Sequence, residues 1–517
     1  MLLLHTREDL AAWRRQQPGP VHFVPTMGSL HAGHRQLIIR AALPLADAAP
    51  AVLVSIFVNP LQFGPEEDLE TYPRELSADS ALAAAAGATA LFVPSVAEMY
   101  PQGDAGLTRI VPPPCLSECL CGRHRPQHFE GVATVVTRLL TLVRPDCLLL
   151  GEKDWQQLVI LRRVVADLGL PLRILGCPTV READGLACSS RNRRLSASQR
   201  QQAAALPAAL AAMQAQVGGG IDRAQALTSQ LTGQLEAAGL EVEYAELVTP
   251  HNLEPVQQVR GLALLAAAVH CGPSRLIDHV FLMSRQPIVA IDGPAGAGKS
   301  TVTRAFARRL GLIYLDTGAM YRALTWWVQH QGADPADAAA VEPLLVDLNL
   351  QLRSGSGGEQ QVSINGHDVT AAIRSPEVTA QVSVVAAHGC VRQALTTQQQ
   401  AMGRQGGLVA EGRDIGTAVF PDAELKVFLT ATVAERARRR ALDLEQRGFA
   451  VPPLAELEAQ IAERDHLDSS REVAPLRQAD DAVELVTDGL AIEAVIQALV
   501  DRFRERVPEE AWPTPAA

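Results

Sequence analysis

The sequence feature that most constrains the fold is a glycine-rich stretch in the middle of the chain, AIDGPAGAGKST at residues 290–301. It fits the pattern G-x-x-x-x-G-K-[ST], whose defining positions are Gly293, Gly298, Lys299 and Ser300. An apolar run precedes the stretch and a helical pattern follows it, which is the strand–loop–helix order in which backbone N–H groups surround phosphate oxygens. Such a loop normally follows the first strand of its domain, so its position predicts that another complete unit precedes it.

The chain is also too long for one hydrophobic core. Its 517 residues exceed the roughly 100–200 residues of a typical domain, which favours about three units. A short polar segment, MSRQP, separates the earlier pattern from the strand that leads into the glycine-rich loop. We therefore expect a first domain over residues 1–175, a smaller subdomain over 176–283 and a loop-bearing domain over 286–507. The proline-rich tail that follows is expected to be frayed.

Composition argues against several classes of protein. Apolar residues make up 47% and charged residues 20%, as in ordinary folded domains, and a net charge of −11 gives no sign of a nucleic-acid partner. No apolar run approaches the ~20 residues that span a bilayer, and the N-terminus lacks the features of a signal peptide. We expect a cytoplasmic protein that acts on small molecules. The spacing of Cys115, Cys119 and Cys121 matches no standard zinc set, which favours reduced thiols.

The first domain alternates apolar runs with Ala- and Leu-rich helical patterns. The runs have the length of buried strands and lie at 21–26, 51–58, 90–94 and 147–151. This alternation predicts an α/β fold with a parallel, doubly wound sheet, as in Rossmann-like domains. After about residue 176 the pattern changes to two helices over 196–239, broken by Gly218–Gly220, and then to strand-like runs that end near residue 283. This second pattern predicts a small α+β subdomain.

The residue types of the central loop suit a nucleoside triphosphate. Lys299 supplies a positive charge near the β- and γ-phosphates, and the hydroxyl of Ser300 can ligate Mg²⁺. The alternative is a tight glycine-rich turn that holds no nucleotide. The strand at 425–430 ends in threonine instead of the acidic residue that many such proteins place near Mg²⁺. We therefore expect the metal to be held by Ser300, substrate phosphates and water, with Asp316 acting indirectly.

Three further stretches carry a family resemblance. YLDTGAMYRA (314–323), LVAEGRDIGTAVFPDAELKVFL (408–429) and ERDHLDSSREVAPL (463–476) are similar, in this order, to the cytidylate kinase family. The resemblance implies a P-loop nucleoside monophosphate kinase domain that transfers phosphate from ATP to CMP or dCMP, with Lys299 as catalytic residue. The ATP-binding residues it implies are Gly293, Gly296, Gly298, Lys299, Ser300, Thr301 and Arg464. The CMP-binding residues it implies are Thr317, Arg322, Ser383, Arg392, Arg413, Asp414, Asp468 and Arg471.

An arginine-rich site agrees with this reaction. Phosphoryl transfer depends on positioning and on neutralising charge, and arginines bind phosphate oxygens bidentately. Two alternatives stay open: the arginines are solvated surface charges, or the kinase prefers UMP. We interpret the run ARRR at 437–440 as a solvated helix face, because Glu435 lies beside it.

The first domain carries a nucleotide signal of its own. VPTMGSLHAGHRQL (24–37) runs from a strand into a helix, with His31 and His34 in an H-x-G-H arrangement at the helix start. Imidazoles and a helix N-terminus can donate hydrogen bonds to ATP phosphates. The pattern resembles the signature of Rossmann-like nucleotidyltransferase domains. The alternative is that exposed histidines merely pack at a helix N-terminus.

Four more stretches resemble the pantothenate synthetase family. They are FVNPLQFGPEEDLETYPR (57–74), LCGRHRPQHFEGVATVV (120–136), LLGEKDWQQL (149–158) and PTVREADGLACSSRNRRL (178–195). The resemblance implies a ligase that joins pantoate and β-alanine through a pantoyl-adenylate and releases AMP and diphosphate, with ATP as substrate, Mg²⁺ as cofactor and a possible homodimer through this half. The whole chain thus resembles a fusion of two enzyme families.

The resemblance also implies roles for single residues in this half. The catalytic residues are His31, His34 and Lys153, with Lys153 at the α-phosphate, where charge develops during transfer. The implied ATP-binding residues are Met27, His31, His34, Gly151, Lys153, Asp154, Ser189, Ser190 and Arg191. The implied pantoate-binding residues are Asn59, Gln62 and Gln157. Two alternatives remain: the ligase activates another small acid, or one half is a catalytically silent module.

The sequence departs from the family pattern at two positions. Gln127 stands where the family usually has glycine, so a backbone with positive φ there would be strained. Cys188 lies beside the paired serines, where we expect a small packed residue in preference to a reactive thiol.

Overall fold

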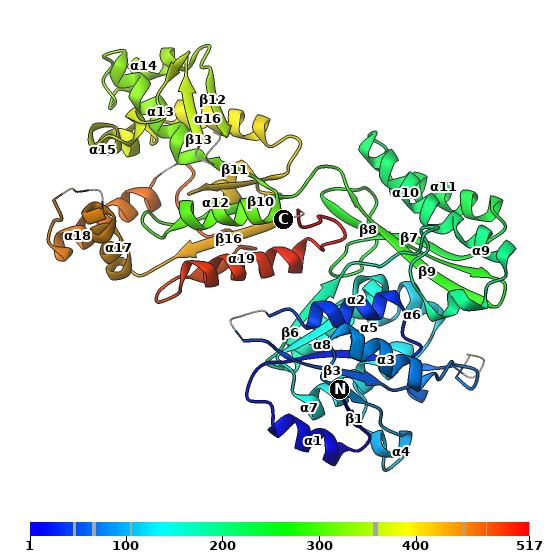
Figure 1. The fold of residues 1–517 in the computed structure, drawn as a ribbon. Coiled ribbons are helices and arrows are strands. Elements are labelled where there is room, and N and C mark those ends of the chain that lie inside the picture. The colour runs from blue at the N-terminus through cyan, green and yellow to red at the C-terminus, as the bar shows by residue number, and fades with distance from the viewer. Residues whose placement is uncertain are drawn as a thin grey trace. The chain divides into compact units, whose positions relative to one another are not determined.

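The computed structural model describes residues 1–44, 48–64, 69–103, 106–354, 360–446, 448, 450–471 and 473–515 (Figure 1). The chain divides into two compact units. Unit 1 comprises Met1–Ser284 together with Pro508–Ala511, and unit 2 comprises Arg285–Val507 together with Trp512–Ala517. The stretch FVNPLQFGPEEDLETYPR is described except for residues 65–68. Within the described residues, no helix combines the length and the apolar character that crossing a membrane requires.

Unit 1 is built on a six-stranded parallel sheet with the strand order β1-β4-β3-β2-β5-β6. The strands are β1 (Leu2–Leu4), β2 (Val21–Thr26), β3 (Ala51–Ile56), β4 (Ala90–Phe92), β5 (Cys147–Gly151) and β6 (Arg173–Cys177). The expected α/β fold is therefore confirmed. Edge strands β1 and β6 were not expected from the sequence, because β1 has only three residues and neither strand is fully buried.

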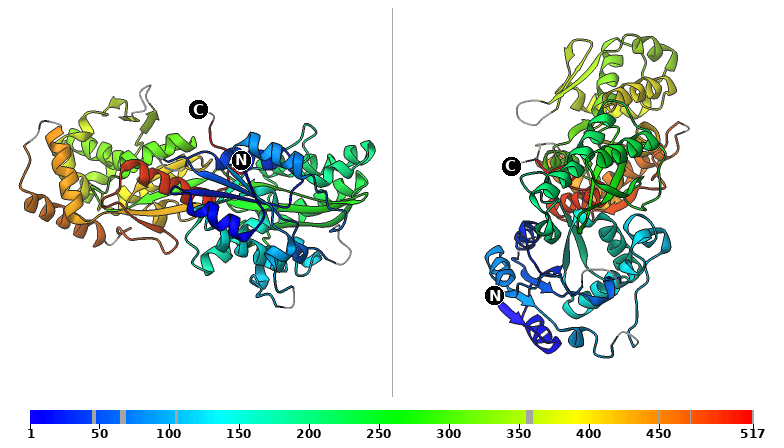
Figure 2. Two further views of the ribbon diagram at one scale, coloured as in Figure 1. Left: turned by 60° about the horizontal axis from the view of Figure 1, so that its bottom comes forward. Right: turned by 90° about the vertical axis from the view of Figure 1, so that its right-hand side faces the viewer.

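Helices lie on both sides of this sheet (Figure 2). Helix α2 packs against α3, and α7 packs against both α1 and α8. The helices and 3₁₀ turns here are α1 (Arg7–Arg15), α2 (Ala32–Ala41), η1 (Pro60–Gln62), α3 (Leu76–Ala86), α4 (Val96–Met99), α5 (Pro114–Ser117), α6 (Leu120–His124), α7 (His128–Val143), η2 (Glu152–Asp154) and α8 (Trp155–Asp167). The chain proceeds from β2 toward β3 on one side and later from β5 toward β6 on the other. The carboxyl ends of β2 and β5 therefore flank a topological switch point, where α/β proteins bind ligands.

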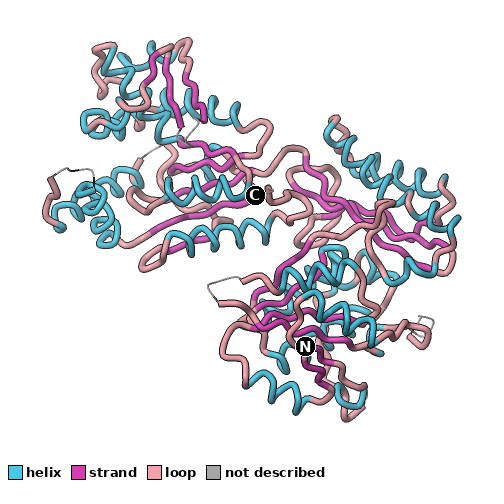
Figure 3. Tube along the Cα trace, viewed as in Figure 1, coloured by secondary structure: helices cyan, strands magenta, loops and turns pink. Residues whose placement is uncertain are grey.

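The rest of unit 1 is an α+β subdomain. Its strands β7 (Glu241–Val248), β8 (Leu262–Cys271) and β9 (Ser274–Met283) form an antiparallel sheet, seen as long magenta strands in Figure 3. Its other elements are η3 (Ser190–Arg194), α9 (Ala197–Ala203), α10 (Ala205–Gly218) and α11 (Ala224–Ala237). The expected break near Gly218–Gly220 is present, but the segment holds three helices instead of two, because the first helical stretch is interrupted at Ala204.

Unit 2 is built on a second parallel sheet, with the strand order β11-β15-β10-β16-β17. The strands are β10 (Ile288–Asp292), β11 (Ile313–Asp316), β15 (Leu408–Gly412), β16 (Leu425–Thr430) and β17 (Val483–Val486). The remaining helical elements are α12 (Lys299–Leu310), α13 (Thr317–His330), α14 (Ala338–Val341), η4 (Glu342–Leu345), η5 (Ala372–Arg374), α15 (Pro376–Val385), α16 (Gly389–Met402), η6 (Ile415–Val419), α17 (Val433–Gln446), α18 (Leu454–Ser469) and α19 (Ile492–Arg506). The glycine-rich loop follows β10, the central strand.

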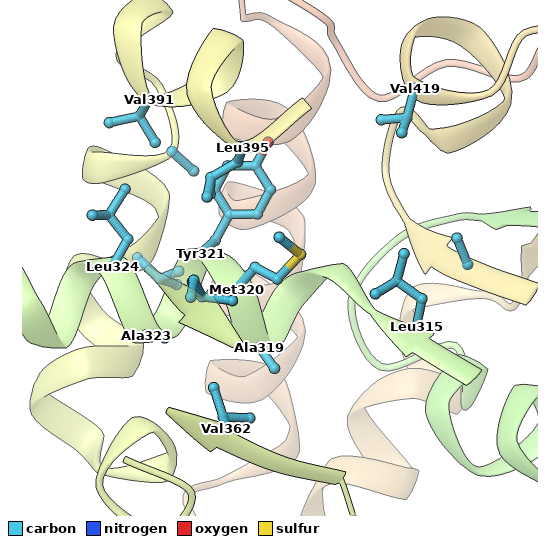
Figure 4. Close-up of a cluster of buried hydrophobic side chains, with 14 of the residues drawn as sticks. Leu315, Ala319, Met320, Tyr321, Ala323, Leu324, Val362, Val391, Leu395 and Val419 are labelled. Carbon is cyan, nitrogen blue, oxygen red and sulfur yellow. The ribbon is translucent and has the colours of Figure 1, made fainter. Parts of the chain in front are cut away.

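A smaller layer of unit 2 covers one end of α13. It contains the antiparallel strands β12 (Leu350–Ser354), β13 (Gln360–Ile364) and β14 (His367–Asp368) together with α15 and α16. Figure 4 shows Met320 and Leu324 of α13 near Leu395 of α16, in a cluster of buried apolar side chains. This packing fixes α13, whose first turns carry two of the expected nucleotide-binding residues, Thr317 and Arg322.

The C-terminal tail is held by specific contacts, so the expectation of a frayed tail is wrong for its described residues. Val507 and Pro508 are buried. Within unit 2 the indole Nε1–H of Trp512 donates to the carbonyl oxygen of Leu310 at 2.7 Å, and Arg504 Nη1 donates to the carbonyl oxygen of Trp512 at 2.5 Å. A composition rich in proline does not imply disorder where a large aromatic side chain can be anchored.

Candidate active sites

The glycine-rich loop of unit 2 joins β10 to the N-terminus of α12. Gly293, Gly296 and Gly298 have φ values of +146°, +79° and +85°. A Cβ atom on Gly293 would lie 2.0 Å from the carbonyl oxygen of Leu429, so only glycine fits there. The loop therefore turns its backbone tightly at the positive end of a helix dipole, which suits an anion.

Lys299 lies at the centre of this loop and is buried. Its Nζ donates to the carbonyl oxygens of Gly293 at 2.7 Å and Pro294 at 2.9 Å. Burial lowers the pKa of Lys299 to about 7, and the positive charge of Arg413 acts in the same direction. An incoming anion would therefore relieve an unfavourable environment for the ammonium group.

A cavity of about 890 Å³ opens beside the loop. This volume suits nucleotide-sized ligands. It is lined by every candidate of this half except Gly293: Gly296, Gly298, Lys299, Ser300, Thr301, Thr317, Arg322, Ser383, Arg392, Arg413, Asp414, Arg464, Asp468 and Arg471. The structure thus brings together residues that are spread over most of unit 2.

Ion pairs hold the arginines of this cavity in place. Arg392 Nη2 lies 2.6 Å from Asp414 Oδ2, and both side chains are buried. Asp468, also buried, accepts from Arg413 Nε at 2.9 Å and pairs with Arg471. Burial lowers the pKa of Arg471, although Asp468 opposes this effect. These groups are ordered in the cavity wall, so the alternative of loose surface arginines does not describe them.

The strand end at Thr430 lacks an acidic residue, but the structure places one nearby on a neighbouring strand. Glu411 of β15 is buried, and its Oε1 accepts from Ser300 Oγ at 2.6 Å and from Tyr314 OH at 2.9 Å. Its Oε2 is buried without a hydrogen-bond partner, and burial raises the pKa of this carboxyl group. Sequence reasoning missed Glu411 because it examined only the strand on the other side of β10; an acid at the end of any neighbouring parallel strand is the signal to seek.

The interpretation of residues 437–440 as a solvated helix face is only partly right. Arg438 is exposed and pairs with Glu435. Arg439, in contrast, donates from Nη1 to the carbonyl oxygen of Ala297 at 3.3 Å and to Thr487 Oγ1 at 2.9 Å, and Arg440 lines the cavity. Arg438 also lines the cavity, although Arg438 and Arg440 are both exposed, and Arg439 contacts the glycine-rich loop because α17 packs alongside it.

In unit 1, the two histidines cap the first turn of α2. His31 Nδ1 accepts from the backbone N–H of Gly33 at 3.2 Å, the backbone N–H of His31 donates to His34 Nδ1 at 3.3 Å, and the two ring centroids lie 4.1 Å apart. Burial lowers the pKa of His31 to about 4 and that of His34 to about 3. Both rings are therefore neutral at pH 7, and each keeps Nε2 for another partner.

The turn before α2 is shaped by a buried acid that sequence reasoning missed. Gly28 and Ser29 have φ values of +85° and +51°. Asp79 of α3 accepts from the backbone N–H of Ser29 at 2.8 Å and from that of Leu30 at 2.7 Å. This bidentate contact compensates the strain of the turn and fixes where α2 starts.

Turn η2 follows β5 and carries Lys153 and Asp154. Lys153 Nζ lies 3.4 Å from Asp154 Oδ1. Burial would raise the pKa of Asp154, but the charges of Lys153 and, more weakly, Arg191 lower it overall. Lys153 also contributes to the lowered pKa of His31. Residues that follow β2, β5 and β6 in sequence therefore interact electrostatically across the switch point.

The amide side chains of unit 1 are linked by a series of hydrogen bonds. Gln62 Nε2 donates to Met27 Sδ at 2.8 Å, and Asn59 Nδ2 donates to Gln62 Oε1 at 3.2 Å. Tyr100 OH donates to Asn59 Oδ1 at 2.8 Å. Asn59 is only 1% exposed and its amide is used within the protein, so it holds Gln62 in place. Its direct contact with a ligand stays a prediction.

Two further side chains, those of Arg125 and His128, extend this series of contacts. His128 Nδ1 lies 2.8 Å from the carbonyl oxygen of Gln62, and Arg125 Nη1 lies 3.0 Å from His128 Nε2. Between them Gln127 has φ +67°, so the strain expected from replacing glycine is present. The sequence alone suggested no role for Arg125 or His128.

A small cavity of about 70 Å³ lies beside these residues. Among the candidates it is lined by Lys153, Asp154 and Gln157, and it also contacts His128 and His279. The other ligase-half candidates do not line it: Met27, His31, His34, Asn59, Gln62, Gly151, Ser189, Ser190 and Arg191. This volume is far too small for ATP, so a nucleotide would occupy the open surface at the carboxyl ends of β2 and β5.

Turn η3 supplies the remaining candidates. Ser189 Oγ accepts from the backbone N–H of Arg191 at 3.3 Å, and Ser274 Oγ donates to the carbonyl oxygen of Arg191 at 3.2 Å. Cys188 is buried, as expected of a packed residue, and burial raises the pKa of its thiol. Over the described ranges, no group of three or more His, Cys, Asp and Glu side chains is arranged to hold a metal ion.

The sequence matches two family profiles. The pantoate-beta-alanine ligase profile matches residues 3–281, and the cytidylate kinase profile matches residues 289–505. The chain is 67% identical over 514 residues to the bifunctional pantoate ligase/cytidylate kinase of Parasynechococcus marenigrum (strain WH8102), covering 99% of this chain and 100% of that protein. It is 65% identical to the protein of the same name from Prochlorococcus marinus (strain MIT 9313), covering 97% and 99%.

Among solved structures, the chain is similar to pantothenate synthetase from Thermus thermophilus. The two share 43% sequence identity with a TM-score of 0.51, and the match covers 54% of this chain and 99% of that one.

Proposed function

Because the chain belongs to the family of bifunctional pantoate ligases/cytidylate kinases, we propose a residue-level mechanism for each of its two activities. Unit 1 is the ligase and unit 2 is the kinase. The observation that carries the proposal is the cavity beside the glycine-rich loop, where phosphate-binding backbone, a buried lysine and ordered arginines converge. In unit 1 the corresponding support is the electrostatic contact of His31, His34 and Lys153 at the switch point.

In the kinase, ATP binds with its phosphates wrapped by residues 293–301. The ammonium group of Lys299 leaves its carbonyl partners and contacts the β- and γ-phosphates. Arg464 then neutralises charge that spreads over the transferred phosphoryl group. The acceptor phosphate of CMP attacks the γ-phosphorus, and ADP leaves with the electrons of the broken P–O bond. The chain supplies positioning and charge, which is what this reaction requires.

Ser300 and Glu411 are the residues we assign to Mg²⁺. The buried Oε2 of Glu411 has no hydrogen-bond partner, and the carboxylate lies against the Ser300 hydroxyl, so the donor set fits a hard cation. When bound, Mg²⁺ neutralises phosphate charge. The sequence suggested that Asp316 contributes indirectly to Mg²⁺ binding. We assign the acidic contribution to Glu411 instead, because Asp316 caps α13 and pairs with Arg322 at 3.1 Å.

CMP occupies the part of the cavity between α13, α15 and η6. The arginine and aspartate pairs described above hold its phosphate and recognise its base and sugar hydroxyls. The residues assigned to CMP are Thr317, Arg322, Ser383, Arg392, Arg413, Asp414, Asp468 and Arg471. A fixed guanidinium–carboxylate pair discriminates between bases, because a mismatched base leaves a buried polar group unpaired.

In the ligase, the carboxylate of pantoate attacks the α-phosphorus of ATP. The bond to the bridging oxygen breaks, and diphosphate leaves with the electron pair. Neutral His31 and His34 donate from their ring nitrogens to phosphate oxygens, and Lys153 stabilises the charge that develops at the α-phosphate. Gly151, Asp154, Ser189, Ser190 and Arg191 complete the proposed ATP site.

The second half-reaction forms the amide. The amine of β-alanine attacks the carbonyl carbon of the pantoyl-adenylate, loses a proton and expels AMP. Gln62 and Gln157, with Asn59 behind them, hold the hydroxyl and carboxyl oxygens of pantoate, and Met27 packs against its methyl groups. Water would hydrolyse the same anhydride, so the site must exclude it. We further propose that the enzyme forms a homodimer through the ligase half and works in the cytoplasm, where ATP is available.

An assay that separates the two products of ATP tests the proposal. We expect AMP when pantoate and β-alanine are supplied and ADP when CMP is supplied. Lys299→Ala should lower ADP formation at least ~100-fold and leave AMP formation intact, and Lys153→Ala should do the reverse. Each unaffected activity controls for folding. If either substitution stopped both reactions in a folded protein, the assignment of one reaction to each unit would be wrong.

A further inference from the structure

Four residues near the end of the chain belong to the ligase unit. Helix α19 is part of unit 2, yet the segment Pro508–Ala511 groups with unit 1, and Trp512 onward groups again with unit 2. The segment reads Pro-Glu-Glu-Ala, and the side chains of Glu509 and Glu510 are only 17% and 19% exposed. Acidic side chains are seldom buried to this degree without partners, so their contacts identify what the segment does.

Glu510 is paired on two sides. Its Oε2 lies 3.3 Å from Nε2 of His279, a β9 side chain that is 3% exposed, and its Oε1 lies 3.8 Å from Arg181 Nη2. Arg181 is itself paired with Asp278 at 2.7 Å. Burial alone would lower the pKa of His279, but the pKa is raised because Glu510, helped by Asp278 and Glu152, acts in the opposite direction. Glu510 thus favours the charged form of a buried imidazole.

Two more contacts anchor the segment. Glu509 Oε2 lies 2.5 Å from Nη2 of Arg40, near the end of α2. The backbone N–H of Glu510 donates to Oε2 of Glu152 at 3.1 Å. Glu152 is 2% exposed, and its side chain packs so closely on Gly176 that a Cβ atom there would lie 2.9 Å from Oε1. A buried carboxyl group needs donors, and the segment provides one.

The three anchored elements are those that frame the proposed ligase site. Helix α2 begins at the histidines, η2 contains Glu152 and Lys153 as consecutive residues, and His279 lines the small cavity together with Lys153. Glu152 is the first residue of a three-residue turn, so the position of its side chain determines how that turn leaves β5. Holding Glu152 therefore also holds the backbone of Lys153.

We propose that Pro508–Ala511 is a positioning element of the ligase: by holding Glu152, Arg40 and His279, it fixes the turn that presents Lys153 to the α-phosphate of ATP. This inference rests on the role given to Lys153 above. Its residues do not line the small cavity of the ligase, so we infer that they act through η2 and α2. A displacement of Lys153 by about 1 Å is enough to slow a reaction that depends on its position.

The test replaces residues 508–511 by Gly-Ser-Gly-Ser in the full chain and leaves Trp512–Ala517 in place. We expect kcat for AMP formation, per titrated pantoyl-adenylate site, to fall about 10- to 100-fold, while ADP formation with CMP stays within about twofold. Glu510→Gln should give a smaller fall, since it keeps the backbone N–H that contacts Glu152. Glu505→Gln is the matched control, because Glu505 is exposed and pairs with Arg502 on the same helix.

Counting active sites separates positioning from simple folding. A purely structural role would reduce the number of titrated sites and leave kcat per site unchanged, and that outcome would overturn the proposal. Lys153→Ala, measured in parallel, separates this inference from the proposed function. If Lys153→Ala abolishes AMP formation but the segment replacement has no effect per site, the positioning role is wrong and the ligase assignment stands. If Lys153→Ala is active, the role of Lys153 itself is wrong.

Discussion

At the scale of single residues, the proposed metal site of unit 2 combines a carboxylate and a hydroxyl that come from different segments. Ser300 starts α12 and Glu411 ends β15, and they meet at 2.6 Å because β15 and β10 are neighbours in the sheet. Tyr314 contacts the same oxygen of Glu411, which leaves the other oxygen buried and free of hydrogen bonds. An unsatisfied buried carboxylate oxygen is costly, so its retention at this position indicates a function.

Glu411→Gln should therefore weaken metal use by the kinase. The amide keeps the shape and can still accept from Ser300, but it removes the negative charge, so we expect kcat for ADP formation to fall about 100-fold and the half-saturating Mg²⁺ concentration to rise. Steady-state assays over a Mg²⁺ series measure both. Tyr314→Phe is the control, since it removes one hydrogen bond and keeps the carboxylate. An unchanged Mg²⁺ requirement would show that Glu411 is not a ligand.

Gln127 gives a residue-scale prediction about stability. Its φ of +67° lies in the left-handed region, which is strained for a residue with a Cβ atom. Gln127→Gly should raise the free energy of unfolding of unit 1 by about 0.5–1 kcal/mol, the strain relief being partly offset by the greater freedom of glycine in the unfolded chain. Chemical denaturation measures it. Gln234→Gly, within helix α11, should instead destabilise by about 1 kcal/mol.

At the scale of elements, the sequence predicted strands well where they are buried on both faces. The runs at 21–26 and 147–151 match β2 and β5 residue for residue, because a central parallel strand is buried over nearly its whole length and is mostly apolar. The sequence did not predict edge strands β1 and β6, because β1 has only three residues and both strands are largely exposed or half-buried. Likewise, motif positions identified the kinase cavity, but the contacts of Glu411 and Arg439 depend on strand order and helix packing, which no local pattern encodes.

The pairing of the C-terminal segment with β9 predicts a dependence on pH. The groups that face His279 are Glu510, its neighbour Asp278 and Glu152. The pKa of His279 is raised from 6.5, so its contribution to stability is complete below pH 6.5 and is lost as the pH rises through the raised value. The pKa of Glu510 is lowered from 4.5, so its contribution is present above pH 4.5 and is lost below it. The pair therefore stabilises unit 1 most between these two values.

Glu510→Gln should accordingly lower the melting temperature of unit 1 more at pH 6 than at pH 8.5. At pH 6 the substitution removes a carboxylate from a charged imidazole, and the loss shrinks as the pH rises through the raised pKa of His279, because the imidazole then becomes neutral. Calorimetry of the full chain and of the variant at both pH values measures the difference. An equal loss at both would mean that His279 does not titrate in this range.

At the scale of the whole molecule, two enzymes share one chain and one co-substrate but no intermediate. The ligase converts ATP to AMP, and the kinase converts ATP to ADP. The candidate residues of each activity belong to one unit only, as the lining of the large cavity illustrates. The position of the glycine-rich loop in the middle of the chain is thus explained: β10 is the first strand of its own sheet.

Shared ATP without a shared intermediate predicts that the activities are additive. With ATP saturating and regenerated, the rate of AMP formation from pantoate and β-alanine should change by less than about 20% when saturating CMP is added. This figure is an order-of-magnitude tolerance for two uncoupled sites, because a ligand shifts another site only through differential affinity. A product assay that resolves AMP, ADP and CDP measures it. A several-fold change in either direction would demonstrate coupling that the separate sites do not explain.

The contacts of Pro508–Ala511 also have a consequence for biosynthesis. The ribosome makes the ligase sheet first and adds this segment only after the entire kinase sheet. The contacts of residues 508–511 with Glu152, His279 and Arg40 therefore cannot form until the whole second enzyme has been translated. A chain that terminates prematurely, anywhere in the kinase and before Pro508, would lack an anchor of its N-terminal enzyme. The order of synthesis thus places the last contacts of the ligase unit after the translation of the kinase sheet.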